Sequence, residues 1–327
     1  MNLGTKEQLL TLFENNKGVF FSGEAIAEKL SISRTAVWKA VKSLRSEGYC
    51  ICAVRNKGYS LSTETDILSV QGIQKYLEPV CSRVTLELVP ALGSTNERAR
   101  EMAVREAPEG YTVIALTQTR GRGRLGRSFY SPADTGIYMS LLLRPQQYSA
   151  QRAAQLTTIA AVAACEAIET LSGEPAQIKW VNDLYVAGKK VGGILTEASV
   201  ALENGLLEYA VLGIGMNLLP PEDGFPADIR DVAGAILKES QNDGKNRLAA
   251  EFLNRFLTYY SGSHGCNLVE SYQKRSLVIG RTVQVLSAGS CKMATALGID
   301  ENYRLLVEYE DGKREALFSG EISVKVS

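Results

Sequence analysis

Histidine is nearly absent from this chain of 327 residues, since His264 is the single histidine. An H-E-x-x-H metalloprotease and any site with two histidine ligands are therefore excluded. A Ser-His-Asp triad would have to use His264, and no G-x-S-x-G sequence accompanies it. The chemistry must rest mainly on Arg, Lys, Asp and Asn side chains. This set of side chains indicates that the protein handles phosphate groups.

Metal-binding cysteine pairs and long apolar runs are also lacking. Six cysteines are scattered without a C-x-x-C pair, so we expect no zinc ribbon and no resident metal. Cys50 and Cys52 stand too close along the backbone for an easy disulfide, and we expect reduced thiols. The longest apolar runs, such as residues 137–143, are too short to span a bilayer, and no apolar signal region opens the chain. We expect a cytoplasmic protein with no membrane partner.

The net charge is zero overall, but it is unevenly distributed. Residues 29–58 contain seven basic side chains and one acid, which leaves a local charge of +6. Such a local excess is typical of a module that contacts DNA phosphates, whereas the neutral total argues against a general nucleic-acid binder.

The start of the chain predicts a helix-turn-helix. We expect Thr5 to cap a first helix, Ser22 to precede a second, and Ser33 to cap a third that Gly48 ends. A tight break at residues 31–33 separates the second helix from the third. The third helix has an apolar stripe for the core, formed by Val37, Val41 and Leu44.

The opposite face of the third helix is polar and basic, and a predicted hairpin at residues 49–61 adds a wing with a basic tip. We expect hydroxyls and Arg to read bases and Lys to hold phosphates. The alternative is a three-helix packing module that binds another protein. Residues 62–66 are polar and are expected to form a linker. The candidate DNA-binding residues are Ser33, Arg34, Thr35, Trp38, Lys39, Lys42, Arg55 and Lys57.

A run rich in glycine and arginine, residues 120–127, follows a predicted strand at 111–117 and precedes another at 137–143. Three glycines let backbone amides approach a ligand, and the arginines offer planar forks that match phosphate or carboxylate oxygens. No G-K-[ST] ends the run, so it is not a P-loop. A disordered RNA-binding segment is the alternative, but a short loop tethered by two strands favours an active-site lid.

Two further stretches carry polar side chains. Residues 93–97 open a helix in which Ser94 and Glu97 have the spacing of a capping box. Residues 178–185 predict one strand, followed by a hairpin tip and a return strand that begins at Lys189. Lys190 then faces the opposite side of the return strand from Lys189, so that one lysine can enter a site while the other faces water.

Taken together, these stretches resemble the biotin protein ligases, and with the front domain the bifunctional ligases that also repress transcription. The motifs occur in order as G-S-T-N at 93–96, G-R-G-R-L-G-R at 121–127, K-W-V-N-D at 179–183, K-V-G-G-I at 190–194 and G-I-G-M-N at 213–217. The match covers nearly the whole chain. One departure is Val181, where the family often has proline.

The resemblance implies an α+β fold in three domains. These are a winged helix-turn-helix at residues 1–65, a catalytic domain at 66–272 and a small SH3-like β-barrel at 273–327. The catalytic domain would contain a mixed β-sheet backed by helices, similar to class II synthetases. The barrel agrees with the alternating strands predicted after residue 281.

The resemblance also implies site residues. Asp183 would accept a proton from the acceptor lysine or orient its amine, or it would contact magnesium or ribose. The implied biotin-binding residues are Ser94, Thr95, Asn96, Gln118, Arg122, Gly123, Arg124 and Lys190. The implied ATP-binding residues are Arg124, Arg127, Asn182, Asp183 and Asn217, and the implied catalytic residues are Lys190, Asp183 and Arg124.

The implied function is that of a ligase which uses ATP and Mg²⁺ to convert biotin into biotinyl-5′-AMP. Biotin would pass to a lysine of the biotin carboxyl carrier protein of acetyl-CoA carboxylase. The chain would also repress biotin synthesis genes, with the adenylate as corepressor that favours a homodimer on operator DNA. An acyltransferase related to lipoate ligases and a ligand-sensing repressor without catalysis are the alternatives.

Overall fold

The structure is a computed structural model that describes residues 4–145, 148–201, 203–262, 267–287, 290–318 and 321–324. His264 and the last three residues of the predicted barrel lie outside this range. The chain forms two compact units, one of residues 1–78 with 239–251 and one of residues 79–238 with 252–327. No helix of the described part is long and apolar enough to cross a membrane.

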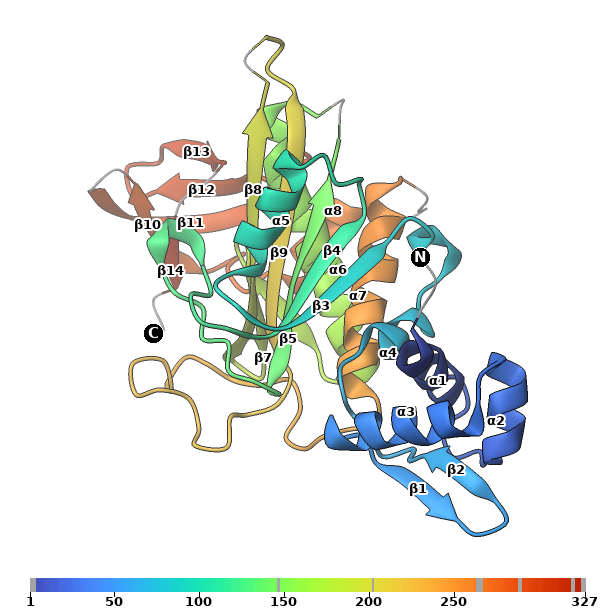
Figure 1. The fold of residues 1–327 in the computed structure, drawn as a ribbon. Helices are drawn as coiled ribbons and strands as arrows, with labels where there is room; N and C mark the ends of the chain where they lie inside the picture. The colour runs from blue at the N-terminus through green and yellow to red at the C-terminus, as the bar shows by residue number, and fades with distance from the viewer. Residues whose placement is uncertain are drawn as a thin grey trace. The chain divides into compact units, whose positions relative to one another are not determined.

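The first unit contains the predicted helix-turn-helix and wing (Figure 1). Ser22 and Ser33 cap the second and third helices, because their hydroxyls accept hydrogen bonds from Ala25 N and Ala36 N. The prediction that Thr5 caps the first helix is wrong by one residue, since Gly4 is the N-cap. The elements are α1 (Thr5–Glu14), α2 (Gly23–Leu30), α3 (Arg34–Ser46), β1 (Ile51–Val54), β2 (Gly58–Leu61) and α4 (Val70–Gln74).

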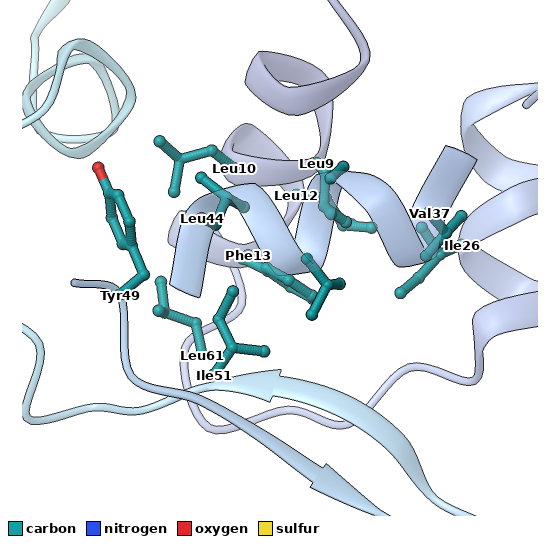
Figure 2. Close-up of a cluster of buried hydrophobic side chains, with 12 residues drawn as sticks. Leu9, Leu10, Leu12, Phe13, Ile26, Val37, Leu44, Tyr49, Ile51 and Leu61 are labelled. Carbon is teal, nitrogen blue, oxygen red and sulfur yellow. The ribbon is translucent and has the colours of Figure 1, made fainter. Parts of the chain in front are cut away.

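The core of this unit is formed by the apolar faces of the three helices and by the base of the wing (Figure 2). The predicted stripe Val37, Val41 and Leu44 is buried, whereas Trp38 on the other face of α3 is 53% exposed. On β1 only Ile51 lies in the core, whereas Cys52, Ala53 and Val54 are exposed. The wing is therefore fixed at its base and free along its outer face.

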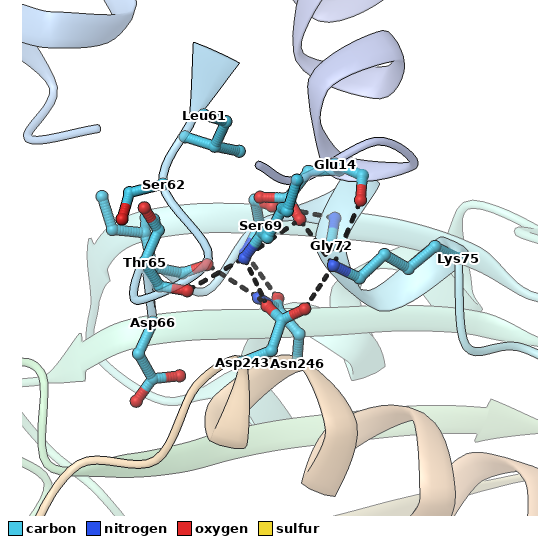
Figure 3. A network of polar contacts seen from close by, with 12 residues as sticks. Glu14, Leu61, Ser62, Thr65, Asp66, Ser69, Gly72, Lys75, Asp243 and Asn246 are labelled. Carbon is cyan, nitrogen blue, oxygen red and sulfur yellow. Dashed lines mark hydrogen bonds and ion pairs between the residues drawn. The ribbon is translucent and has the colours of Figure 1, made fainter. Parts of the chain in front are cut away.

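A buried ionic network ties a distant segment to this unit (Figure 3). Lys17 Nζ lies 2.9 Å from Asp243 Oδ1, and Lys75 Nζ lies 2.8 Å from Glu14 Oε2. Lys75 also pairs with Asp243. Burial by itself would raise the pKa of Asp243, but hydrogen bonds from Lys75, Lys17, Tyr76 and Asn246 outweigh burial and hold this pKa below its ordinary range.

The residues after the wing are part of the same contact rather than a free linker. Asp66 Oδ1 accepts a hydrogen bond of 2.9 Å from Lys245 N, at the start of α7 (Gly244–Tyr260). The Asn246 side chain donates to Ile67 O at 2.8 Å and accepts from Ser69 N at 3.0 Å. The linker expected at residues 62–66 therefore ends in a residue whose carboxylate caps the distant helix α7.

The second unit is built on a mixed seven-stranded sheet of order β3-β4-β5-β9-β8-β7-β6, in which only β3 and β4 are parallel. Successive side chains on a strand point to opposite faces of the sheet. On β8, Glu197 contacts Asn96 of α5, whereas its neighbour Thr196 contacts Thr157 of α6. The two helices therefore cover opposite faces of the sheet (Figure 1). The elements are β3 (Thr85–Leu92), α5 (Thr95–Val104), β4 (Tyr111–Gln118), β5 (Gly136–Leu143), α6 (Ala150–Ser172), β6 (Ala176–Lys179), β7 (Asp183–Val186), β8 (Lys189–Val200) and β9 (Leu207–Asn217).

The C-terminal part adds α8 (Leu268–Arg275) and a five-stranded antiparallel sheet of order β13-β12-β11-β10-β14. The strand-rich domain predicted after residue 281 is thus confirmed as an antiparallel sheet. Its strands are β10 (Thr282–Ser287), β11 (Ser290–Ile299), β12 (Leu305–Tyr309), β13 (Arg314–Leu317) and β14 (Glu321–Val324).

The single strand predicted at residues 178–185 is wrong, because β6 and β7 are two antiparallel strands joined by a turn. The turn contains Trp180, Val181 and Asn182, and the Trp180–Val181 peptide bond is cis. The prediction for the two lysines is confirmed. Lys189 Nζ donates to Asp231 O, whereas Lys190 Nζ pairs with Asp183.

Asp243→Asn should destabilise the first unit by about 3 kcal/mol at neutral pH, because it removes one partner of a buried ion-pair network. Asp243 has a φ of +62°, which asparagine tolerates, so the substitution changes the charge and not the backbone. Urea unfolding measures this difference. Exposed Glu64→Gln is the matched control and should change stability by less than about 0.5 kcal/mol.

The stability difference between the native chain and Asp243→Asn should also depend on pH. The pKa of Asp243 in the folded chain lies below its ordinary value of 3.8, so its stabilisation is present above that pH and is lost as pH falls through the folded pKa. The stability gap between native protein and Asp243→Asn should shrink below about pH 4. A gap that stays constant from pH 7 to pH 3 would contradict a role for the charge.

Candidate active site

Most of the residues predicted to contact small substrates line one pocket in the second unit. They come from the start of α5, the end of β4, the glycine–arginine loop (residues 121–127), the turn between β6 and β7, and the strands β7 and β8. The predicted residues that line it are Ser94, Thr95, Asn96, Gln118, Arg122, Gly123, Arg124, Arg127, Asn182, Asp183 and Lys190.

The floor of the pocket is the sheet face on which α5 begins. A Cβ atom on Gly213 of β9 would lie far inside van der Waals contact with Asn96 Oδ1, so only glycine lets the first turn of α5 approach so closely. Gly215 has the same relation to the Phe129 ring. Ser140 Oγ on β5 lies 2.6 Å from Asn96 Oδ1 and 2.7 Å from Thr95 Oγ1. Its single hydrogen serves one of these acceptors at a time.

The first turn of α5 is capped from outside the helix. Ser94 is the N-cap residue, but its side chain makes no capping hydrogen bond, so the predicted capping box with Glu97 is wrong. Gln118 Oε1 instead accepts from Thr95 N at 2.8 Å and from Thr95 Oγ1 at 3.1 Å. The Ser94 hydroxyl is thereby left to face the pocket. Glu97 pairs with Arg120 at 3.5 Å.

The glycine–arginine loop folds back on itself around a short 3₁₀ turn at Arg124–Gly126. Gly123 N donates to Arg127 O at 2.7 Å, and Arg122 forms an antiparallel bridge with Ser128. Arg124 points into the pocket, where its guanidinium donates to Asn182 Oδ1 at 3.1 Å. Burial lowers the pKa of Arg124, although the charge of Asp183 opposes this effect. A partly desolvated guanidinium is well suited to hold an anion.

Two lysines, Lys179 and Lys190, lie on the same side of the pocket as Arg124. We call this side, which also includes Asn182 and Asp183, the cationic wall. Lys190 Nζ lies 2.6 Å from Asp183 Oδ1. Lys179, at the end of β6, was missed from the sequence although it begins the K-W-V-N-D motif. Burial lowers the pKa of Lys179, Asp183 opposes this, and the nearby charges of Lys190 and Arg127 lower it further. The other lining residues that sequence reasoning missed are Leu125, Ser128, Phe129, Trp180, Gly193, Ile194, Leu195, Gly213, Ile214 and Gly215.

The turn that carries Asn182 is supported from behind by the C-terminal residues. Tyr272 of α8 is fully buried, and its hydroxyl donates to Val181 O at 3.1 Å. Trp180 Nε1 donates to Tyr303 O at 3.3 Å. Asn182 Nδ2 donates to Ile194 O at 3.0 Å. The site is therefore completed by contacts far along the chain.

Asn217 is the one predicted substrate residue that does not line the pocket. It ends β9, is buried, and donates from Nδ2 to Gly234 O at 3.1 Å. Its contact with ATP stays a prediction.

The candidate DNA-binding residues lie in the first unit and are all exposed. Lys42 Nζ lies 5.5 Å from the centre of the Trp38 ring, a cation–π distance. The hydroxyl of Ser33 is already engaged in capping α3. The polar face of α3 and the tip of the wing therefore present Arg, Lys and Trp side chains to solvent.

Comparison with known proteins matches each part of the chain. The biotin/lipoate A/B protein ligase family matches residues 88–217, an HTH domain family matches residues 5–60, and the biotin protein ligase C-terminal domain matches residues 278–325. The chain is 35% identical to the bifunctional ligase/repressor BirA of Bacillus spizizenii, over 98% of both chains. It is 29% identical to that of Escherichia coli, over 97% of this chain and 96% of the relative.

The chain belongs to the biotin protein ligase family. Its front domain makes it similar to the bifunctional ligase/repressors of that family, and the α+β fold expected from the sequence is confirmed. A solved biotin protein ligase from Aquifex aeolicus, in complex with biotin and ATP, is similar with a TM-score of 0.60 and 26% identity. That similarity covers 74% of this chain and 99% of the Aquifex chain.

Gly213→Ala should disturb this biotin protein ligase at its floor, because the added methyl group meets the side chain of Asn96. We expect destabilisation of about 1–3 kcal/mol by overpacking, together with a large loss of ligase activity. Thermal unfolding and activity assays measure the two effects. Gly298→Ala in β11 is the matched control, since its Cβ would meet nothing within 4 Å. Equal effects of the two substitutions would contradict the close-approach argument.

Proposed function

We propose that the chain joins biotin to ATP as biotinyl-5′-AMP and transfers biotin to a lysine of a biotin carboxyl carrier protein. The observation that carries this proposal is the pairing of a polar floor with a cationic wall inside one pocket. Ser94 and Asn96 lie on the floor, and Lys190 and Arg124 lie on the wall. The two chemical ends of biotin need these two environments.

The floor suits the ureido ring of biotin, which offers two N–H groups and one carbonyl. Ser94 has a hydroxyl without a capping bond, Asn96 Oδ1 can accept beside its contact with Ser140, and Gln118 Nε2 has a second N–H beside the one that it donates to Ser131 Oγ. The wall suits the carboxylate at the other end of the molecule. Lys190 and Arg124 would neutralise this carboxylate and hold it near the nucleotide.

ATP and its magnesium fit the rest of the wall. Mg²⁺ prefers oxygen ligands and usually takes several of them from substrate phosphates and water. Asp183 is the carboxylate of this wall. Within the described part of the chain, no group of three or more His, Cys, Asp or Glu side chains could hold a metal ion. We therefore propose that Mg²⁺ arrives with ATP and that Asp183 and Asn182 offer it oxygen atoms.

In the first step a carboxylate oxygen of biotin attacks the α-phosphorus of ATP, and pyrophosphate leaves. Negative charge grows on the phosphoryl oxygens as the new bond forms. Fixed cations stabilise this transition state more than the separated substrates, because they are already oriented. Lys190 is oriented by Asp183, and Arg124 is oriented by Asn182.

In the second step the amine of the carrier lysine attacks the acyl carbon, and AMP leaves with the electron pair of the broken C–O bond. The amine must lose a proton to form the amide. Asp183 stands at the pocket wall, where Oδ1 already pairs with Lys190, so Oδ2 is the oxygen that would orient the incoming amine or accept its proton. The glycine–arginine loop would cover the adenylate and exclude water between the two steps.

We also propose that the adenylate acts as corepressor and favours a homodimer on operator DNA. Two copies of the helix-turn-helix would match a palindromic operator. The exposed basic face of α3 and the basic tip of the wing support the DNA part of this proposal. Local charge of this kind provides affinity through phosphate contacts.

Biotin should support exchange of labelled pyrophosphate into ATP, because the first step is reversible. Lipoate should not, because its dithiolane ring lacks the hydrogen-bonding groups of the ureido ring. Exchange with lipoate but not biotin would instead identify a lipoate ligase. Exchange with neither acid would identify a ligand-sensing repressor without catalysis.

Lys39→Ala should weaken operator binding for all sequences by a similar factor and reduce the slope of log affinity against log salt by about one. The pyrophosphate exchange rate should not change, since Lys39 lies on α3. Titration of labelled operator at several salt concentrations measures the slope. Lys313→Ala is the matched control, because it removes the same charge from an exposed turn of the C-terminal sheet. An unchanged slope in Lys39→Ala would contradict a phosphate contact.

A further inference from the structure

Glu197 on β8 connects two parts of the pocket that no sequence motif links. Its Oε2 accepts a hydrogen bond of 2.8 Å from Asn96 Nδ2 on the floor. Its Oε1 lies 3.4 Å from a terminal nitrogen of Arg122 in the glycine–arginine loop. One carboxylate thus has one oxygen on the floor and the other on the loop.

The floor end of this connection is rigid. Asn96 is 4% exposed, and its amide is fixed on several sides. Nδ2 also reaches Leu195 O at 3.2 Å, and Ser140 Oγ lies 2.6 Å from Oδ1. This Oδ1 atom occupies the space that a Cβ atom on Gly213 of β9 would take. Asn96 therefore holds the Glu197 carboxylate in one orientation.

The loop end of the connection is more open to solvent. The side chain of Arg122 is 41% exposed and that of Glu197 is 27% exposed. An ion pair of this exposure contributes about 0–1 kcal/mol. An energy of this size contributes little to the stability of the whole fold. If the loop exchanges between an open and a closed state, however, loss of the ion pair raises the population of the open state by up to about fivefold.

We propose that Glu197 is a positioning residue that keeps the glycine–arginine loop closed over the adenylate. The proposal rests on the proposed function, because a retained adenylate exists only if the first step occurs. The fixed anion of Glu197 faces Arg122, so the loop opens only when this ion pair breaks. Glu197 does not touch the reacting atoms and acts through Asn96 and Arg122.

Glu197→Gln separates the two contacts of the side chain. The amide oxygen of glutamine can still accept from Asn96 Nδ2, whereas the negative charge that attracts Arg122 is removed. Glu197→Ala removes both contacts. Glu208→Gln is the matched control, because Glu208 is an exposed acid on the neighbouring strand β9 that bonds Ser199 outside the pocket.

The experiment compares formation of the adenylate with its escape, in the full-length chain. Formation is the rate of biotin-dependent pyrophosphate exchange and the KM for biotin. Escape is the biotin label that appears on lysines of an added bystander protein, such as serum albumin. We expect Glu197→Gln to keep exchange and KM within about twofold while escape rises about two- to fivefold. Glu197→Ala should also raise the KM for biotin, and Glu208→Gln should match the native chain in every measurement.

Escape at the native level in Glu197→Gln would overturn the proposal. A parallel loss of exchange in Glu197→Gln would also overturn it, because the residue would then act in substrate binding or folding. Absence of exchange in the native chain would overturn the proposed function and, with it, the retention role.

Discussion

The pocket depends on the close approach of the first turn of α5 to the central sheet. Glycine at position 213 permits this approach, because any side chain there would occupy the position of the Asn96 amide. Once Asn96 lies against the sheet, Ser140 and Glu197 from two different strands reach its two ends. Interiors of proteins are packed so closely that such a contact leaves one arrangement. Because residue 213 has no side chain, Asn96 can lie against the sheet, and its contacts with Ser140 and Glu197 then fix its orientation.

A second constraint is the balance of charge around the pocket. Lys190 and Arg124 are held by Asp183 and Asn182, so the cationic wall is oriented before a substrate enters. The cations are only partly paired, and Lys179 carries a pKa lowered mainly by burial. Oriented cations at a partly desolvated wall interact strongly with phosphate, because they need little rearrangement when negative charge develops.

The resemblance of the motifs to those of the biotin protein ligases predicts the fold class and most of the residues that line the pocket. Thr95, Arg124 and Lys190 lie in those motifs, and the resemblance implied their place in the site. Ser140 and Glu197 could not be predicted, since they lie inside plain strands and reach the pocket only through the register of β5, β8 and β9. Lys179 could have been found, since it begins a motif that was already recognised.

Local patterns failed where distant residues supply the missing partner. Ser94 has the spacing of a capping residue, but Gln118 from the end of β4 caps the helix instead. Residues 178–185 have the composition of one strand, but Tyr272 and Tyr303 contact the turn that divides it. Tertiary contacts of this kind override local propensity and cannot be read from neighbours in the sequence.

The first compact unit is discontinuous, because residues 239–251 complete it from a position far beyond the helix-turn-helix. A ribosome makes the chain from the N-terminus at about 5–20 residues per second. The ion pairs of Lys17 and Lys75 with Asp243 therefore cannot form until most of the chain has been synthesised. The same holds for the hydrogen bond between Asp66 and the start of α7. The helix-turn-helix thus precedes the central sheet in the order of synthesis, yet its unit is completed only after that sheet has been made.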